Sequence, residues 1–388
     1  RGPDTPDEMR VLAKVFVWLQ GSTTGDRGEI NLNGPIEREV WSRISAADEG
    51  CSAENCMRRT GGACPFYRTR IAAQSAHLII VNHALLLADV ATGNRVLPEY
   101  DYLIVDEAHH IESATTNALS FRVTQTDIKY LLRELGSSKS GILGRILGFL
   151  HDAVPPSEFA GLERRVERCT DHAFQMENLI GTFFSTLDDF LLEQRDGKNV
   201  GNYGQQERIL PSTRTQPAWL NVEITWEDAQ VVMRSLLKST EQVALNLVEF
   251  SKSGFGDIDD LEDVYNNLTN VYRRVEEVFE NIESLVFEPQ PDRIYWAEVR
   301  SNSRGLTLQA APLHIGTLMQ EYVWHQKHAV ILTSATLTTA GEFDYIRNRL
   351  YAEDAYEIAL GSPFDYENST LLYIPDNIPE PGDRFGHQ

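Results

Sequence analysis

Three side chains that follow a short apolar run have the types needed for phosphate chemistry. The stretch YLIVDEAHH, residues 102–110, places Asp106, Glu107 and His109 after four apolar residues. Parallel sheets bind ligands at the carboxyl ends of their strands, where Asp106 could hold Mg²⁺ and Glu107 could orient or deprotonate a water. His109 could bridge the phosphate site to another segment. The plainer alternative is an acid pair that ends a strand and begins a helix.

A second apolar run ends in small and hydroxyl residues. The stretch LTSATL, residues 332–337, carries Thr333, Ser334 and Thr336 around the small Ala335. These hydroxyls could bond to the acids of a neighbouring strand and relay a change in nucleotide state. A strand-end turn followed by a helix cap is the alternative.

Three of the four cysteines lie close together. Cys51, Cys56 and Cys64 have the spacing C-x4-C-x7-C, and a proline follows the last one. Gathered thiolates suit soft metals, and the proline is typical of iron–sulfur ligation. Zinc is the nearest alternative, although its sites favour tighter cysteine pairs, and chance clustering of buried thiols is a third. Cys169 lies alone in a helical region, which indicates a structural thiol.

Positive charge and aromatic rings accompany the cysteine cluster, although the chain as a whole is acidic. The net charge is −22, whereas residues 56–77 hold four arginines and no acid. This pattern favours binding of a single nucleic-acid strand at that segment. The alternative is that these residues are ordinary surface residues of a loop. The predicted DNA-binding residues are Arg58, Arg59, Phe66, Tyr67, Arg68 and Arg70.

The elements that must position these residues read as an α/β fold. Two apolar runs, HLIIVN at 77–82 and YLIVDE at 102–107, have the length of buried strands and are joined through a helix, which predicts a parallel sheet. The strand pattern resumes in HAVILTSATL at 328–337. Residues 114–310 instead carry long helix-periodic stretches, which predict a mostly α-helical insertion. No apolar run approaches the ~20 residues of a membrane span, so we expect a cytoplasmic protein with no membrane partner.

The motifs together resemble the XPD/DinG family of iron–sulfur superfamily 2 DNA helicases, and bacterial DinG-like proteins most of all. The resemblance lies in the cysteine loop, IIVNHALLLAD, LPEYDYLIVDEAHHIE, APLHIGTLM and VILTSATL, which occur in the family's order. It implies a partial RecA-like motor domain of the P-loop NTPase class with two insertions. The implied divisions are an iron–sulfur domain at 1–75, motor domain 1 at 76–113 and 311–370, a helical Arch domain at 114–310, and a linker at 371–388.

The same resemblance implies roles for individual residues. Asp106, Glu107 and His109 correspond to motif II, and Thr333 to Thr336 to motif III. Cys51, Cys56 and Cys64 correspond to the second to fourth ligands of a 4Fe-4S cluster. The implied activity is ATP- and Mg²⁺-dependent 5′→3′ unwinding of forked or structured duplex DNA by a monomer that moves on single-stranded DNA, in repair or replication.

One family motif is missing. No G-x-x-x-x-G-K-[ST] phosphate loop occurs in the sequence, and DGKNV at 196–200 lacks the hydroxyl residue and follows motif II. We therefore expect the chain to be the middle portion of a helicase, lacking the phosphate loop, the first cluster cysteine and the second motor domain, and inactive alone as an ATPase. A non-enzymatic single-stranded DNA-binding or scaffolding module is the alternative, and an RNA motor is a third possibility.

Overall fold

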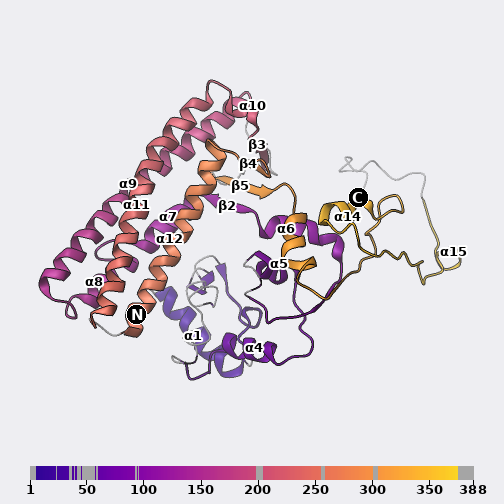
Figure 1. Ribbon diagram of the computed structural model, residues 1–388, viewed down its shortest axis with the longest axis horizontal. Coiled ribbons are helices and arrows are strands. Elements are labelled where there is room, and N and C mark those ends of the chain that lie inside the picture. Colours follow the sequence, from indigo (N-terminus) through magenta and orange to yellow (C-terminus); the bar gives the residue numbers. More distant parts are fainter. Residues whose placement is uncertain are drawn as a thin grey trace, which may run out of the picture.

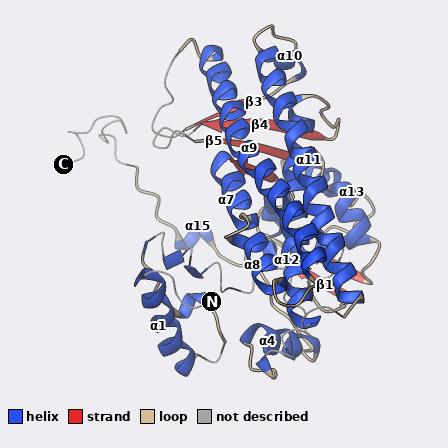
Figure 2. Cartoon of the chain, turned by 90° about the vertical axis from the view of Figure 1, so that its left-hand side faces the viewer, coloured by secondary structure: helices blue, strands red, loops and turns tan. Residues whose placement is uncertain are grey.

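The computed structural model describes most of the chain, and its elements are shown in Figures 1 and 2. The described residues are 6–22, 24–34, 37–38, 40–41, 45, 57, 60–91, 94, 96–197, 204–254, 258–299 and 305–374. Their hydrophobic side chains gather into three separate cores. No helix in these ranges combines the length and apolar character that a membrane span requires.

The helices and strands come in an order that places a long helical region between two parts of an α/β unit. Before this region lie α1 (Pro6–Gly21), η1 (Arg27–Glu29), α4 (Pro65–Gln74), α5 (His83–Ala91), β1 (Tyr102–Val105), η2 (Ala108–His110) and α6 (Ile111–Ala118). The region itself holds β2 (Phe121–Thr124), α7 (Gln125–Leu135), α8 (Gly141–Leu150), α9 (Pro156–Gln194), β3 (Gln205–Arg208), α10 (Pro211–Arg214), α11 (Trp219–Lys252), α12 (Ile258–Val286), β4 (Arg293–Val299) and β5 (Leu306–Pro312). After it come α13 (Gly316–Met319), the π-helix η3 (Gln320–Trp324), β6 (Ala329–Leu332), α14 (Asp344–Leu350) and α15 (Tyr366–Ser369).

The α/β unit is built on two parallel strands that are far apart in the sequence. β1 pairs with β6, with Tyr102 opposite Ala329 and Val105 opposite Leu332. Val105 belongs to a core that also receives residues from α5, α6, α13, η3 and α14. The predicted α/β class with a parallel sheet is therefore confirmed, and the carboxyl ends of β1 and β6 lie at one edge.

One predicted strand does not form. The run HLIIVN at 77–82 has no strand structure, and its Leu78 and Ile80 side chains are 76% and 88% exposed. The prediction of a buried strand was wrong because apolar composition alone does not make a strand. A strand needs hydrogen-bonding neighbours, and among the described residues this segment has none.

A buried polar group holds the chain between α5 and β1. Asp89 is fully buried, and its Oδ1 accepts the main-chain N–H groups of Val96 and Leu97 at 2.8 and 2.9 Å. Burial, followed by the charge of Asp89, raises the pKa of the nearby Tyr100 to about 12. The Lys327 ammonium lies 3.5 Å from the Tyr100 ring centroid, and burial lowers its pKa. This network ties the start of β1 to the segment that leads into β6.

The long helices α9, α11 and α12 pack side by side around the largest core (Figure 1). With 39 residues, α9 is about 58 Å long. Trp219 and Trp226 of α11 are fully buried and lie 5.2 Å, between ring centroids, from Phe190 and Phe183 of α9. The amphipathic periodicity of the sequence is explained by this packing.

The helical region also contains an antiparallel sheet in the strand order β2-β5-β4-β3. The sequence predicts a mostly α-helical insertion at 114–310 and does not indicate this sheet. Here β5 is buried at nearly every position, and β2 turns directly into α7 through a capping box between Thr124 and Asp127.

The N-terminal part has a small core of its own. Val11 of α1 is fully buried, and Trp18 packs at the same core. Gly25 has a φ of +71°, and a β-carbon there would overlap Pro65 at the first turn of α4. The glycine therefore permits close contact between the loop after α1 and the start of α4.

Candidate functional site

The carboxyl ends of β1 and β6 bring the two hydroxyl- and acid-bearing motifs together. Because the strands are parallel and Val105 is opposite Leu332, the residues that follow each strand meet at the same edge. The Thr333 N–H donates to the Val105 carbonyl at 2.9 Å, and the Ala108 N–H donates to the Thr333 carbonyl at 3.0 Å. These two bonds hold the strand ends beside each other.

The turn after β1 has an unusual backbone conformation at Glu107. Its φ and ψ are 49° and 42°, the left-handed region, which non-glycine residues adopt uncommonly. The Asp106 carboxylate accepts the Glu107 N–H at 2.9 Å, and the Asp106 carbonyl contacts His83 Nε2 at 2.9 Å. Sparsely populated conformations of this kind cluster at functional sites, although Asn94, Asp196, Ala340 and Tyr351 also have a positive φ in this chain.

Three polar side chains form a compact cluster beyond this turn. His109 Nδ1 lies 2.7 Å from Ser334 Oγ and 3.2 Å from Glu107 Oε2, and Ser334 Oγ lies 3.5 Å from the same carboxylate oxygen. Because an ionised carboxylate only accepts, the 3.2 Å contact favours a hydrogen on Nδ1. The Glu107 side chain is 60% exposed and that of His109 is 32% exposed, so both are open to a ligand.

The motif III residues differ in how they contact the acid motif. Ser334 alone among the predicted hydroxyls bonds to the acid motif through its side chain. Thr333 contributes main-chain bonds, and the Thr336 N–H donates to Ser334 Oγ at 3.3 Å. Ala335 lies in the turn between them.

A supporting contact behind the site had not been predicted from the sequence. Glu112, on the first turn of α6, accepts from Arg349 Nε at 2.7 Å and from the Tyr345 hydroxyl at 3.1 Å. Both partners lie on α14, which follows motif III. The contact joins the helices that follow the two motifs. Glu112 lies six residues after Asp106, and this proximity to the acid motif could have suggested a supporting role. No local feature of the sequence pointed to Arg349. His83 was likewise missed.

The described part of the cysteine segment contains only one of its three thiols. Cys51, Cys56, Arg58 and Arg59 lie outside the described residues. Cys64 is a half-buried free thiol at the N-cap of α4, with no side-chain capping bond. Among the described residues, no group of three or more His, Cys, Asp and Glu side chains is arranged to hold a metal ion.

Helix α4 presents the remaining predicted DNA-binding residues. Phe66, Arg68 and Arg70 are exposed, Tyr67 is half-buried, and no residue of the helix is fully buried. The Arg70 guanidinium lies 5.8 Å from the Phe66 ring centroid, so charge and ring share one face.

Cys169 belongs to the core of the helical region. It is fully buried on α9 and lies 3.3 Å from Thr240 Oγ1 of α11. Burial raises the pKa of this thiol, although hydrogen bonds from Thr240 and Ser239 act in the opposite direction. A thiol in this setting packs as a small apolar group.

Comparison with known proteins finds similarity along almost the entire chain. The family described as DEAD_2 matches residues 47–128. The protein named 3′-5′ exonuclease DinG from Bacillus subtilis is 26% identical over 97% of this chain and 39% of its own length. ATP-dependent DNA helicase DinG from Photobacterium profundum is 26% identical over 98% of this chain and 52% of its own. ATP-dependent DNA helicase YoaA from Escherichia coli is 22% identical over 98% and 51%.

These similarities confirm the resemblance to DinG-like helicases predicted from the motifs. The chain spans between about two fifths and one half of the length of these relatives.

Proposed function

We propose that this DinG-like chain is the middle portion of an ATP-dependent DNA helicase. In the whole protein, ATP hydrolysis would drive 5′→3′ movement along single-stranded DNA and the opening of forked or structured duplexes. The observation that carries the proposal is the cluster of Glu107, His109 and Ser334 at the shared carboxyl edge of β1 and β6. Relatives named as ATP-dependent DNA helicases support it.

The side chains at this edge would have different roles in phosphate transfer. Asp106 would hold Mg²⁺ through water, and bound Mg²⁺ would neutralise charge on the phosphate oxygens. Glu107 would orient or deprotonate the attacking water. His109 would transmit the state of the site to Ser334, and through it to the segment Thr333–Thr336, because it contacts both Glu107 and Ser334.

The cysteine segment and α4 would form the DNA-facing part. Cys51, Cys56 and Cys64 would hold a 4Fe-4S cluster together with a fourth thiolate from outside this chain. Such a cluster would cross-link the segment covalently. Single-stranded DNA would be bound by charge and stacking from Arg58, Arg59, Phe66, Tyr67, Arg68 and Arg70.

We further propose that the isolated chain hydrolyses no ATP. A motor of this class holds its nucleotide in a glycine-rich loop whose N–H groups surround the phosphates, and this sequence contains no such motif.

Substitution of Glu107 by Gln tests the enzymatic proposal in the longest natural protein that contains this chain. We expect ATP hydrolysis to fall by about a hundredfold or more, because general-base catalysis contributes at least that factor. Affinity for single-stranded DNA should not change, and Glu193→Gln on an exposed turn of α9 serves as the control. Single-strand binding without ATPase activity in the unsubstituted protein would instead favour the non-enzymatic binding module.

The cluster proposal has its own measurement. The longer protein, purified without oxygen, should contain iron and sulfide in equal amounts and show a visible iron–sulfur absorption that Cys64→Ser weakens. Stoichiometric zinc without sulfide would contradict it. Unwinding assays on DNA and RNA duplexes would distinguish a DNA motor from an RNA motor.

A further inference from the structure

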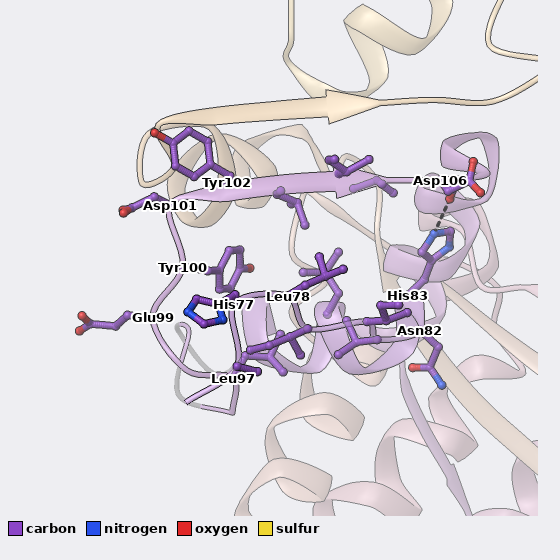
Figure 3. A pocket seen from close by; sticks show the side chains of 18 of the residues that line it. His77, Leu78, Asn82, His83, Leu97, Glu99, Tyr100, Asp101, Tyr102 and Asp106 are labelled. Atoms are coloured by element: carbon purple, nitrogen blue, oxygen red, sulfur yellow. Dashed lines mark hydrogen bonds between the residues drawn. The ribbon is translucent and has the colours of Figure 1, made fainter. Parts of the chain in front are cut away.

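His83 forms a hydrogen bond with the main chain of the turn that follows β1. Its Nε2 lies 2.9 Å from the Asp106 carbonyl oxygen. Figure 3 shows the two residues on opposite sides of a groove of about 850 Å³, at the end where β1 finishes. Because a carbonyl oxygen only accepts, the ring carries a hydrogen on Nε2, as one neutral tautomer and the protonated ring both do. The bond is therefore compatible with either of these forms.

The start of α5 fixes the place of the His83 ring. The Asn82 Oδ1 accepts the Leu85 N–H at 2.9 Å, as the side chain of an N-cap residue does, and His83 is the first residue of the helix. Leu86, three residues further on, is buried in the same core as Val105, the last residue of β1. The helix that carries His83 is therefore packed against the strand that carries the turn.

The peptide group between Asp106 and Glu107 sets the direction of the Glu107 carboxylate. Glu107 has a φ of 49°, a region that residues with a side chain populate sparsely. Rotation of this peptide toward the commoner negative φ would move the carboxylate away from His109, whose Nδ1 is 3.2 Å from it. The His83 bond restrains the carbonyl end of the peptide, and the Asp106 carboxylate restrains the N–H end at 2.9 Å.

We propose that His83 is a positioning residue of the candidate site, which holds the Asp106–Glu107 peptide and thereby aims the Glu107 carboxylate at the attacking water. The inference rests on the proposed function for the role of Glu107. Of the side chains that the structure describes, only His83 bonds to this peptide from outside the turn. It contacts the main chain and neither carboxylate, so it takes no part in the proton transfer itself.

Two substitutions separate the hydrogen bond from the bulk of the ring. His83→Phe keeps a ring of similar size and removes the donor. His83→Gln keeps a side-chain N–H donor with a similar reach from the main chain. His77→Phe is the matched control, because His77 is an exposed histidine at the other end of the same segment (Figure 3).

Amide hydrogen exchange of the 388-residue chain tests the positioning without requiring ATPase activity. In His83→Phe we expect the amides of Glu107 and Ala108, which are hydrogen-bonded at this turn, to exchange about threefold to tenfold faster, as the loss of one hydrogen bond predicts. His83→Gln and His77→Phe should exchange like the unsubstituted chain. The amide of Val90, in the buried part of α5, should be unchanged in every variant and so report that the α/β unit is folded.

Steady-state kinetics of the longer protein test the consequence for catalysis. His83→Phe should lower the kcat for ATP hydrolysis by about tenfold to a hundredfold, because a misplacement of about 1 Å can cost a hundredfold. The KM for ATP should not change, because the lost restraint acts on the chemical step. His83→Gln should recover most of the kcat, which it would not do if the ring only filled space.

Three results would overturn the role of His83. These are unchanged exchange of the Glu107 amide in His83→Phe, equal losses of kcat in His83→Phe and His83→Gln, and a raised KM with an unchanged kcat. An unsubstituted longer protein without ATPase activity would refute the proposed function, and the exchange of Glu107 would still decide whether His83 holds the turn. Normal ATPase activity in His83→Phe would refute the role of His83 and leave the proposed function intact.

Discussion

At the residue scale, the contact of His109 with both Glu107 and Ser334 links the acid motif to the hydroxyl motif. A change in the charge or position of Glu107 would alter the contact that His109 makes with Ser334. These contacts connect the end of β1 directly to the segment that follows β6.

Substitution of Ser334 by Ala should weaken this link without removing the acids. The hydroxyl lies 2.7 Å from His109 Nδ1, and loss of one hydrogen bond costs about 0.5–1.5 kcal/mol. We expect the kcat for DNA-stimulated ATP hydrolysis in the longer protein to fall about threefold to tenfold. Thr338→Ala, four residues further on, is the control. Equal losses in the two variants would show that Ser334 has no special role.

The Glu37 carboxylate should make the stability of the N-terminal part of the chain sensitive to acid. Hydrogen bonds from Lys14 Nζ and the Asn33 N–H, at 2.7 and 2.6 Å, lower the pKa of Glu37. A lowered pKa in the folded state adds stability above the unfolded value of about 4.3. That stability disappears as the pH falls through the folded pKa.

Glu37→Gln should therefore reduce the pH dependence of the stability of the N-terminal part below about pH 5. The measurement is a pH titration followed by the fluorescence of Trp18, which packs at the same small core. Glu193→Gln, on an exposed turn of α9, should leave the titration unchanged. An unaltered acid transition in Glu37→Gln would contradict the assignment.

At the element scale, a contact between α6 and α14 connects the two segments that follow motif II and motif III. Glu112 of α6 is held by Arg349 and Tyr345 of α14, and each of these helices follows one of the motifs. Displacement of either helix would therefore shift the strand end to which it is attached. The contact is partly shielded, with side chains of Glu112 and Arg349 that are 21% and 31% exposed.

Arg349→Met should loosen this connection. A partly exposed ion pair contributes up to about 1 kcal/mol, so we expect amides of α6 to exchange up to about fivefold faster. Arg347→Met is the matched control, because Arg347 lies on the same helix but pairs with Glu357, after the end of α14. Equal acceleration of α6 in both variants would mean that the effect comes from α14 as a whole.

At the scale of the whole molecule, the three cores should unfold separately. The core of the helical region contains fully buried aromatic side chains such as Trp226, whereas the N-terminal core around Val11 is small. Small cores bury too little apolar area for high stability. In hydrogen exchange at increasing urea, peptides that contain Val11 should lose protection before peptides that contain Trp226. Simultaneous loss would indicate one cooperative unit.

The chemical types of the site residues and their order along the chain can be recognised from the sequence. Local sequence pattern indicates acids and a histidine after one apolar run and hydroxyl residues after another. It also indicates the long helix-periodic stretches between them. Local pattern is sufficient for a helix such as α9, because the hydrogen bonds of a helix join residues four positions apart. The order of the motifs also indicated the resemblance that the comparisons confirm.

Which of these residues are in contact depends on the tertiary structure. Ser334, rather than Thr333 or Thr336, meets His109 because of the register between β1 and β6, and register depends on strands more than 200 residues apart. The pairing of β2 with β5 is equally non-local. The failure of HLIIVN to form a strand has the same physical origin, because a strand is stabilised by hydrogen bonds to its neighbours and no local sequence can supply them.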